Sequence, residues 1–409
     1  MTTRRQVLQY GVASTLGVAT LAQGASPVPL IAPGYADLPA GAMSTGDLEA
    51  LPGKLPLIKR AWRPPNYETP LEYFTEDFTP NRAFFVRYHL ANIPEVDAAK
   101  WSLSVGGPSA GTPFTLSLAQ LKSDFPAAEV AAVCQCSGNR RGLFEPHVPG
   151  VEWGAGAMGN ARWKGARLKD ILAKAGVRPD AIEIVFEGAD GPVLPSTPDF
   201  TKSLPLAKAM DDNTLVAYEM NGEPLPHWNG FPARIVVPGW TGTYWVKHVT
   251  AIQAVAKPYD GFWMKSAYRI PTGRFPLVDR FISQETAANT PITEMVVNSL
   301  VTSLAAGQRA PVGKPLEVKG IAWDGGYGIS RVDVSADGGR TWTAAALGPD
   351  HGRFSFRSFS LAVTPQAAGP MVIMARASNR AGAAQTFDLI PNPPGYHHNV
   401  VQRIAVEAV

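Results

Sequence analysis

Short β-prone runs separated by glycine and proline turns fill the last third of the chain. Beyond about Thr290, roughly six or seven such runs, among them residues 316–323, 329–335 and 371–377, occupy about 120 residues. This spacing predicts an immunoglobulin-like β-sandwich. The Cys-Trp-Cys pattern of antibody domains is missing from the sequence. We expect this module to serve dimerisation or interdomain packing rather than catalysis.

Composition places the chain among ordinary globular proteins. It has 409 residues, of which 45% are hydrophobic and 17% charged, so it can bury the cores of two or three domains. The formal net charge of +3 argues against nucleic acid and against an anionic membrane surface as partners. The 39 glycines and 37 prolines favour a β-rich, turn-rich protein over a helical one.

The patterns along the chain predict an α+β protein with a mixed α/β catalytic domain and a C-terminal sandwich. We expect an export signal and its tail in residues 1–40 and an extended arm without regular elements in residues 41–70. Strands and helices alternate irregularly through residues 71–289, the expected catalytic domain, and residues 290–409 form the sandwich.

The N-terminus carries an export motif. Arg4 and Arg5 precede a mild apolar segment, residues 10–22, which predicts a twin-arginine signal and a periplasmic protein. The alternative is a short amphipathic first helix. The apolar segment is too short to span a bilayer, so we expect no membrane span. Since this route exports folded proteins, it favours a cofactor inserted before export.

The two cysteines of the chain stand one residue apart. A disulfide between Cys134 and Cys136 within one strand would be badly strained. A glycine turn at Gly138 and two cations, Arg140 and Arg141, follow. A thiolate beside arginines suggests a soft-metal ligand facing an anion pocket. The alternative is a buried cysteine pair followed by a solvated turn.

Other cations and polar aromatics follow short strand-like runs. Arg87 and His89 are two apart and would share one face of a strand, although an edge strand with two solvated residues gives the same pattern. Arginine forks suit oxyanions and pyrophosphate groups. The sequence has no Cys-x-x-Cys and no His-x-x-x-His motif, so a metal would bring most of its own ligands, as in a dithiolene cofactor. The candidate residues are Arg87, His89, Arg141, Arg234, Lys247 and Tyr268.

Seven motifs in order, from about Leu55 onward, resemble the sulfite oxidase family of molybdenum enzymes, and their details look most like its bacterial sulfite dehydrogenases. The motifs are Phe85-Val86-Arg87-Tyr88-His89, Gln135-Cys136-Ser137-Gly138-Asn139-Arg140-Arg141, Ala161-Arg162-Trp163-Lys164-Gly165, Phe186-Glu187-Gly188-Ala189-Asp190, Tyr218-Glu219-Met220-Asn221-Gly222-Glu223-Pro224-Leu225-Pro226, Gly230-Phe231-Pro232-Ala233-Arg234 and Val246-Lys247.

The resemblance implies roles for the residues around the substrate. Cys136 would be the protein thiolate on molybdenum. Arg87 and Arg141 would bind the sulfite dianion, while the phenol of Tyr268 would orient it and relay a proton. Trp153 falls where the animal enzymes place an aromatic wall. Cys134 would be an ordinary strand residue.

The resemblance also implies a molybdenum-molybdopterin cofactor. Two positions depart from the animal enzymes: Asn229 replaces a common histidine, and Pro394 stands where an extra substrate arginine occurs. The residues implied to contact the cofactor are Phe85, Val86, Arg87, Tyr88, His89, Cys136, Asp190, Asn229, Arg234, Trp245, Val246 and Lys247.

The implied activity is oxidation of sulfite to sulfate. Because the sequence has no Cys-x-x-Cys-His site, we expect no haem in this chain and a separate c-type cytochrome as the electron acceptor. The assembly would be a homodimer or a heterodimer with that cytochrome. Two other classes remain open: a related periplasmic molybdenum reductase of the sulfoxide or nitrate type, and a cofactor-free binding protein.

Overall fold

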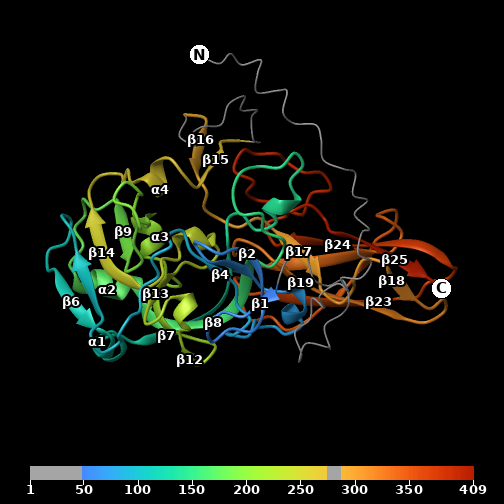
Figure 1. Ribbon diagram of the computed structural model, residues 1–409, viewed down its shortest axis with the longest axis horizontal. Helices are drawn as coiled ribbons and strands as arrows, with labels where there is room; N and C mark the ends of the chain where they lie inside the picture. The colour runs from blue at the N-terminus through green and yellow to red at the C-terminus, as the bar shows by residue number, and fades with distance from the viewer. Residues whose placement is uncertain (1–47, 274–286) are drawn as a thin grey trace, which may run out of the picture.

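The computed structural model describes residues 48–273 and 287–409 (Figure 1). The expected export signal therefore lies outside the described residues. Cyan to yellow strands such as β6 and β14 occupy one end of the long axis and red strands such as β25 the other, with the blue strands β1 and β2 between them (Figure 1). None of the helices in the described parts is long and apolar enough to cross a membrane.

A small antiparallel sheet forms where no regular element was expected. It consists in order of β1 (Leu48–Glu49), β2 (Leu57–Ala61), β3 (Asn66–Glu68) and β4 (Val86–Arg87). The expectation of an arm without regular elements was wrong because the prolines of this stretch lie in the turns between these strands. One consequence is that Arg87 sits on a strand held only by β3 among the described strands.

The second sheet has five strands in the order β10-β9-β14-β5-β6. All of its neighbouring pairs are antiparallel except β14 with β5. Its members are β5 (Ser102–Gly106), β6 (Phe114–Ser117), β9 (Glu183–Gly188), β10 (Thr201–Pro205) and β14 (Val249–Val255).

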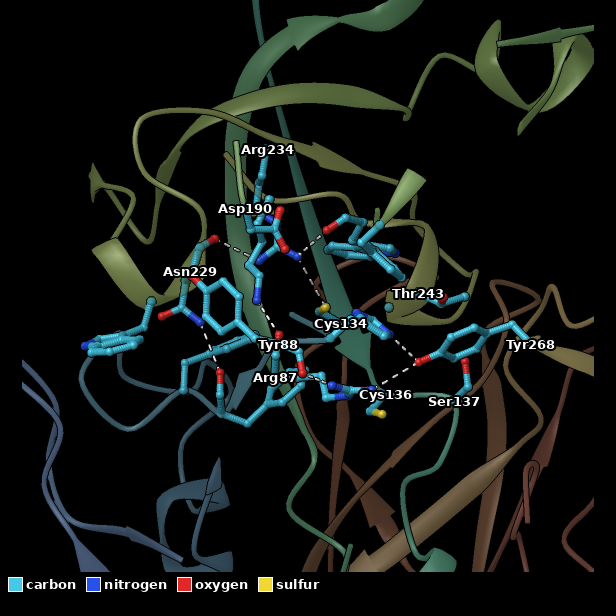
Figure 2. Close-up of a pocket in the computed structure, with 18 residues that line it drawn as sticks. Arg87, Tyr88, Cys134, Cys136, Ser137, Asp190, Asn229, Arg234, Thr243 and Tyr268 are labelled. Carbon is cyan, nitrogen blue, oxygen red and sulfur yellow. Dashed lines mark hydrogen bonds between the residues drawn. The ribbon is translucent and has the colours of Figure 1, made fainter. Parts of the chain in front are cut away.

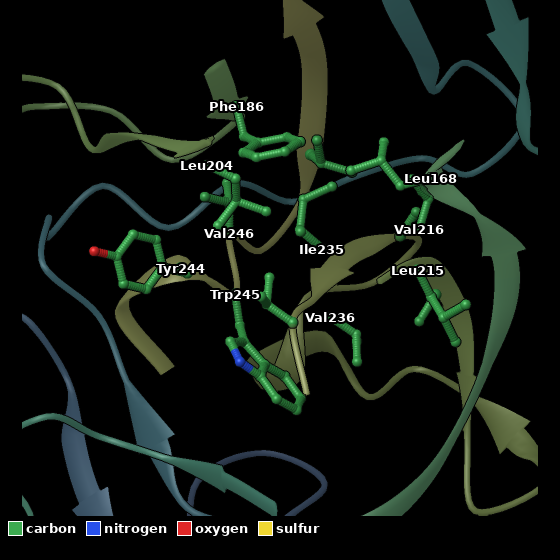
Figure 3. Packing of buried hydrophobic residues seen from close by; sticks show 14 of the residues in the cluster. Leu168, Phe186, Leu204, Leu215, Val216, Ile235, Val236, Tyr244, Trp245 and Val246 are labelled. Atoms are coloured by element: carbon green, nitrogen blue, oxygen red, sulfur yellow. The ribbon is translucent and has the colours of Figure 1, made fainter. Parts of the chain in front are cut away.

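The third sheet carries Cys134 and runs β12-β11-β8-β7, with β13 also paired to β11. Asn221 and Gly222, both at positive φ, form the hairpin turn between β11 and β12. Between the second and third sheets lies the main hydrophobic core (Figure 3). The strands are β7 (Ala127–Gln135), β8 (Met158–Arg167), β11 (Leu215–Met220), β12 (Glu223–Pro224) and β13 (Arg234–Val236).

Helices are few and short in the described residues. Two of them have local end signals: Ser117 caps α1 with a capping box to Gln120, and Gly176, at positive φ, follows the end of α2. The protein is thus mostly sheet, with helices as connections. They are α1 (Leu118–Ser123), α2 (Leu168–Lys174), α3 (Leu206–Ala209), α4 (Phe262–Lys265) and the 3-10 turns Leu71–Phe74, Arg141–Leu143, His227–Asn229 and Gly242–Tyr244.

The C-terminal module contains two sheets around a core of its own. One runs β17-β19-β23-β22 and the other β18-β25-β24-β20-β21, so the expected strand-rich module is present. The pair β15 (Arg269–Pro271) and β16 (Asn289–Pro291) precedes it. The other strands are β17 (Asn298–Val301), β18 (Gln308–Ala310), β19 (Leu316–Trp323), β20 (Ile329–Ser335), β21 (Thr343–Ala344), β22 (Ala346–Leu347), β23 (Arg357–Val363), β24 (Gly369–Asn379) and β25 (Arg403–Ala408).

Strand β7 packs directly on this module. The backbone N–H of Val133 donates to Phe354 O over 2.9 Å, and Trp323 Nε1 donates to Gln135 Oε1 over 2.6 Å. A shared apolar cluster that includes Val133 and Trp323 buries the contact. Contact with the C-terminal module therefore fixes the end of β7, which Cys136 directly follows.

Candidate active site

A cavity, partly open to solvent, lies beside the end of β7. Figure 2 shows its walls, which come from segments far apart in sequence. Val86, Val246, Trp153 and Arg141 are not among the lining residues. The predicted residues that do line it are Phe85, Arg87, Tyr88, His89, Cys136, Asp190, Asn229, Arg234, Trp245, Lys247 and Tyr268.

Cys136 follows the last residue of β7, and its N–H donates to Ala157 O over 2.9 Å. The thiol is a free, buried group that lines the cavity. The neighbouring Ser137 hydroxyl is buried without a hydrogen-bond partner among the described residues. Because buried polar groups are normally paired, an unpaired hydroxyl beside a thiol indicates a polar group meant to occupy this space.

The phenol of Tyr268 joins Arg87 and His89, and Figure 2 shows both contacts. Arg87 Nη2 donates to Tyr268 Oη over 3.3 Å, and His89 Nε2 is also hydrogen-bonded to that oxygen. Strand β4 ends at Arg87, so His89 lies beyond the strand. The side chains of both residues nevertheless reach the phenolic oxygen of Tyr268. Burial raises the pKa of Tyr268 and, with Arg87 and two lysines nearby, lowers that of His89 well below its usual value. The phenol and the imidazole of this hydrogen bond are therefore both uncharged at neutral pH.

Two buried cations face the other side of the cavity. Arg234 donates to Asn229 O and to Trp245 O, each over 2.9 Å, and its Nε has no partner among the described residues. Lys247 donates to Arg87 O and lies 3.2 Å from the centroid of the Tyr88 ring. Burial lowers the pKa of Lys247 well below its usual value. Charges buried against carbonyls and rings favour an anionic occupant.

Asp190 lies on the same side of the cavity (Figure 2). Burial raises the pKa of its carboxyl to about 6, although the charge of Lys247 opposes this shift. The Thr243 hydroxyl, also on the wall, is buried without a partner among the described residues. A thiol, orphaned hydroxyls and buried cations together suit a large anionic group that carries a soft metal.

Asn229 connects this wall to the N-terminal segment. Its Nδ2 donates to Phe85 O over 3.1 Å, and its Oδ1 accepts from Lys54 Nζ over 2.5 Å. Lys54 also donates to Asn81 O over 2.8 Å and to Phe84 O over 3.0 Å. The sequence analysis missed Lys54, because a single lysine among prolines gives no local signal that it will be buried.

Cys134 is a strand residue, as expected, and it also lines the cavity. Its Sγ lies 4.0 Å from Arg234 Nη2. Burial raises the pKa of this thiol to about 11, so it is uncharged at neutral pH. The sequence signal that Cys134 would line the cavity was its two-residue spacing from Cys136, because residues i and i+2 of a strand share a face.

Arg141 and Trp153 do not line the cavity, although the charge of Arg141 acts on the Tyr268 phenol and opposes the rise in its pKa. Arg141 Nε donates to Pro394 O over 2.9 Å and Nη1 to Val151 O over 3.3 Å. Trp153 is fully buried, and its indole N–H has no partner among the described residues. The neighbouring Arg140 donates to Asn298 Oδ1 over 2.8 Å.

Comparisons with known proteins agree with this site. Residues 89–263 match the oxidoreductase molybdopterin binding domain, and residues 289–409 match the Mo-co oxidoreductase dimerisation domain. The chain is therefore a molybdopterin-binding oxidoreductase with a dimerisation domain.

Similar protein sequences indicate which kind of molybdopterin-binding oxidoreductase this chain resembles. Sulfite oxidase of Gallus gallus is 37% identical over 361 residues, which cover 85% of this chain and 76% of that protein. Mitochondrial sulfite oxidase of Homo sapiens is 40% identical, covering 72% of this chain and 54% of that protein. The chain thus spans about half the length of the mammalian relatives it matches.

Among solved structures, the sulfane dehydrogenase SoxCD from Paracoccus pantotrophus matches with a TM-score of 0.70 at 28% identity, covering 83% of this chain and 84% of that one. The chain belongs to the sulfite oxidase family of molybdenum enzymes. Its cofactor is molybdenum held by molybdopterin, as the sequence predicted.

Proposed function

We propose that this chain is the catalytic subunit of a periplasmic sulfite dehydrogenase that passes electrons to an external c-type cytochrome. The observation that carries the proposal is the meeting of Arg87, His89 and Tyr268 in the cavity that Cys136 also lines. A cation, an imidazole and a phenol beside a metal-ligating thiol suit a tetrahedral or pyramidal oxyanion. The names of the relatives, sulfite oxidase and sulfane dehydrogenase, support sulfur oxyanion chemistry.

The cofactor supplies the two-electron redox chemistry when it is bound. Cys136 would ligate the molybdenum through Sγ. Lys247, Arg234 and Asp190, with the backbone around Phe85 and Tyr88, would hold the pterin and its phosphate, because they form the buried charged wall of the cavity. Val86 and Val246, both buried, would support this wall from behind.

Arg87 and Arg141 would bind the sulfite dianion. Charge-assisted hydrogen bonds are each worth roughly 1.5–3 kcal/mol, so two arginines suffice for useful affinity. Tyr268, whose phenolic oxygen is already hydrogen-bonded to His89 Nε2, would orient the anion and relay a proton. Trp153 is proposed to support the pocket from outside the lining layer.

The location and the partner are parts of the same proposal. Arg4 and Arg5 support export by the twin-arginine route. The match of residues 289–409 to a dimerisation domain supports a homodimer or a heterodimer with the cytochrome. Fractionation of cells that express the full chain tests the location: Arg4→Lys with Arg5→Lys should leave the protein in the cytoplasm, and unchanged export would contradict it.

An activity panel tests the reaction. The purified full chain, with its molybdenum content measured, is assayed for sulfite oxidation with ferricyanide and with cytochrome c. Parallel assays supply a sulfane donor for oxidation, and nitrate and methionine sulfoxide with a reduced dye. We expect sulfite to give the highest kcat/KM. A higher value for any other substrate would reject the proposal, and a protein that takes up no molybdenum would favour a cofactor-free binding role.

A further inference from the structure

We propose that Tyr396 of the C-terminal module is a positioning residue for the anion pocket. Its ring lies against both Arg141 and Tyr268, so one side chain holds two groups that would contact the substrate. The inference rests on the proposed function only in naming sulfite as the anion. The contacts themselves come from the geometry.

Tyr396 belongs to a series of adjacent rings and cations that runs from Arg141 to Lys202. The rings of Tyr268 and Tyr396 are nearly parallel, at 6°, with centroids 5.8 Å apart. Arg141 Cζ lies 5.2 Å from the centroid of the Tyr396 ring. Lys202 Nζ lies 5.1 Å from the centroid of the Tyr268 ring. Each neighbour in this series is within the range of stacking or cation–π attraction.

The turn that carries Tyr396 is held firmly. Asn392 Nδ2 donates to Tyr396 O over 2.8 Å, and the N–H of Tyr396 donates to Asn392 Oδ1 over 2.9 Å. Pro394 O in the same turn accepts from Arg141 Nε. At Gly395, which has φ +63°, an added Cβ would lie 2.9 Å from Arg141 Cγ, so the turn packs tightly on the arginine.

Arg141 has only neutral partners in the described parts of the chain. Its guanidinium donates to the carbonyls of Pro394 and Val151, packs on the Tyr396 ring and is about nine-tenths buried. A buried cation with such partners keeps an uncompensated charge available to an anion. Its orientation depends on the turn and on the ring.

Tyr268 also needs support from its surroundings. Its backbone has φ +58°, a conformation that is unfavourable for a side chain of this size. The stack with Tyr396 restricts the ring on one side, and the hydrogen bonds to Arg87 and His89 restrict the hydroxyl. Loss of the Tyr396 ring should therefore loosen Arg141 and Tyr268 together.

Three variants of the molybdenum-loaded full chain separate positioning from general stability. Tyr396→Leu removes the ring, and Tyr396→Phe keeps it. Phe356→Leu removes a ring of similar size from the buried cluster between the modules and serves as the matched control. The readouts are sulfate binding by calorimetry, the KM and kcat for sulfite, and the Tm.

We expect Tyr396→Leu to raise the Kd for sulfate and the KM for sulfite about fivefold to tenfold, with a smaller change in kcat. Tyr396→Phe and Phe356→Leu should stay within about twofold of the parent in Kd, whatever their Tm. If Tyr396→Leu does not fold, Asn392→Ser, which frees the turn and keeps the ring, should raise the Kd in the same direction.

An unchanged Kd for sulfate in Tyr396→Leu, or in Asn392→Ser where Tyr396→Leu does not fold, would overturn the inference, as would a loss in Phe356→Leu equal to that in Tyr396→Leu. Failure of the inference about Tyr396 can be distinguished from failure of the proposed function. A parent protein that binds sulfate but does not oxidise sulfite would reject the reaction while the calorimetric comparison still tests Tyr396.

Discussion

Arg140 Nη1 donates to Asn298 Oδ1 over 2.8 Å, so the loop after Cys136 is tied to the first long strand pair of the C-terminal module. The adjacent Arg141 is tied to the same module through Pro394 O. Two neighbouring cations of one loop thus have their partners in another domain, and the site depends on that domain for its geometry.

Substitutions of the two arginines and of the cysteine should impair different kinetic parameters. Arg87→Gln and Arg141→Gln should each raise the KM for sulfite about 10- to 100-fold, because each removes a charge-assisted contact. Cys136→Ser should abolish turnover, with far less effect on oxyanion binding, because it removes the proposed metal ligand. Steady-state kinetics and calorimetry with sulfate measure both effects.

Arg162→Gln, on the exposed side of β8, is the control. An unchanged KM in both arginine variants would remove them from the anion pocket.

Gly138 leaves room for the Arg141 guanidinium. A Cβ added there would lie 2.7 Å from Arg141 Cζ, closer than any packed contact allows. Gly138→Ala should therefore displace the guanidinium and raise the KM for sulfite about tenfold, while stability changes by less than about 1 kcal/mol. Gly191→Ala, whose Cβ would meet only Asn92 Nδ2 at 3.9 Å, should leave the KM unchanged. Equal KM values for the two variants would show that Arg141 is not needed in its observed position.

Lys54 should be required for both stability and cofactor retention. Lys54→Met leaves Asn229 Oδ1 and two carbonyls without their donor, and we expect a loss of about 3 kcal/mol in the free energy of unfolding. Because Asn229 also contacts Phe85 and Arg234, molybdenum content should fall as well. Urea unfolding and metal analysis measure the two effects.

The control for Lys54 is Lys59→Met on β2. Lys59 pairs with Glu49 at 2.6 Å, and both side chains are about one-third exposed. Ion pairs of this kind contribute about 0–1 kcal/mol, so stability should change little. A loss in Lys59→Met as large as that in Lys54→Met would show that the effect is not specific to the buried lysine.

Buried histidines should make the fold acid-sensitive. Burial lowers the pKa of His248 and of His398 to about 3, against 6.5 in the unfolded chain. The unfolded state then binds more protons below pH 6.5, so stability is fully present above about pH 6.5 and falls as the pH drops toward 3. Urea unfolding between pH 8 and pH 4 measures the loss. His398→Asn should reduce the slope, and a slope equal to that of the parent would contradict the assignment.

The sequence predicted those features that depend on local pattern. The turn-rich, mostly β composition indicated by the 39 glycines and 37 prolines agrees with a protein built mostly of sheets. The resemblance placed Arg87, Cys136 and Tyr268 at one site, and the structure brings them to one cavity. The strand-rich C-terminal module also followed from turn spacing.

Other features depend on tertiary contacts and could not be predicted in this way. Strands β1 to β3 are short and separated by turns that contain proline, so they become strands only by pairing with one another and with β4. Lys54 is buried because Asn81, Phe84 and Asn229 supply acceptors from elsewhere in the chain. Neither feature has a periodic signal in the sequence.

The contact between Arg141 and Pro394 joins residues 253 positions apart, and the one between Lys54 and Asn229 joins residues 175 apart. Bringing such distant segments together is slow, because the chain loses loop entropy before these contacts form. The cavity should therefore complete its walls late in folding. The order of assembly would then be a property of the site: a partly folded chain could offer Cys136 to a metal before Arg141 has reached its place, and oxyanion selectivity would be the last property the enzyme acquires.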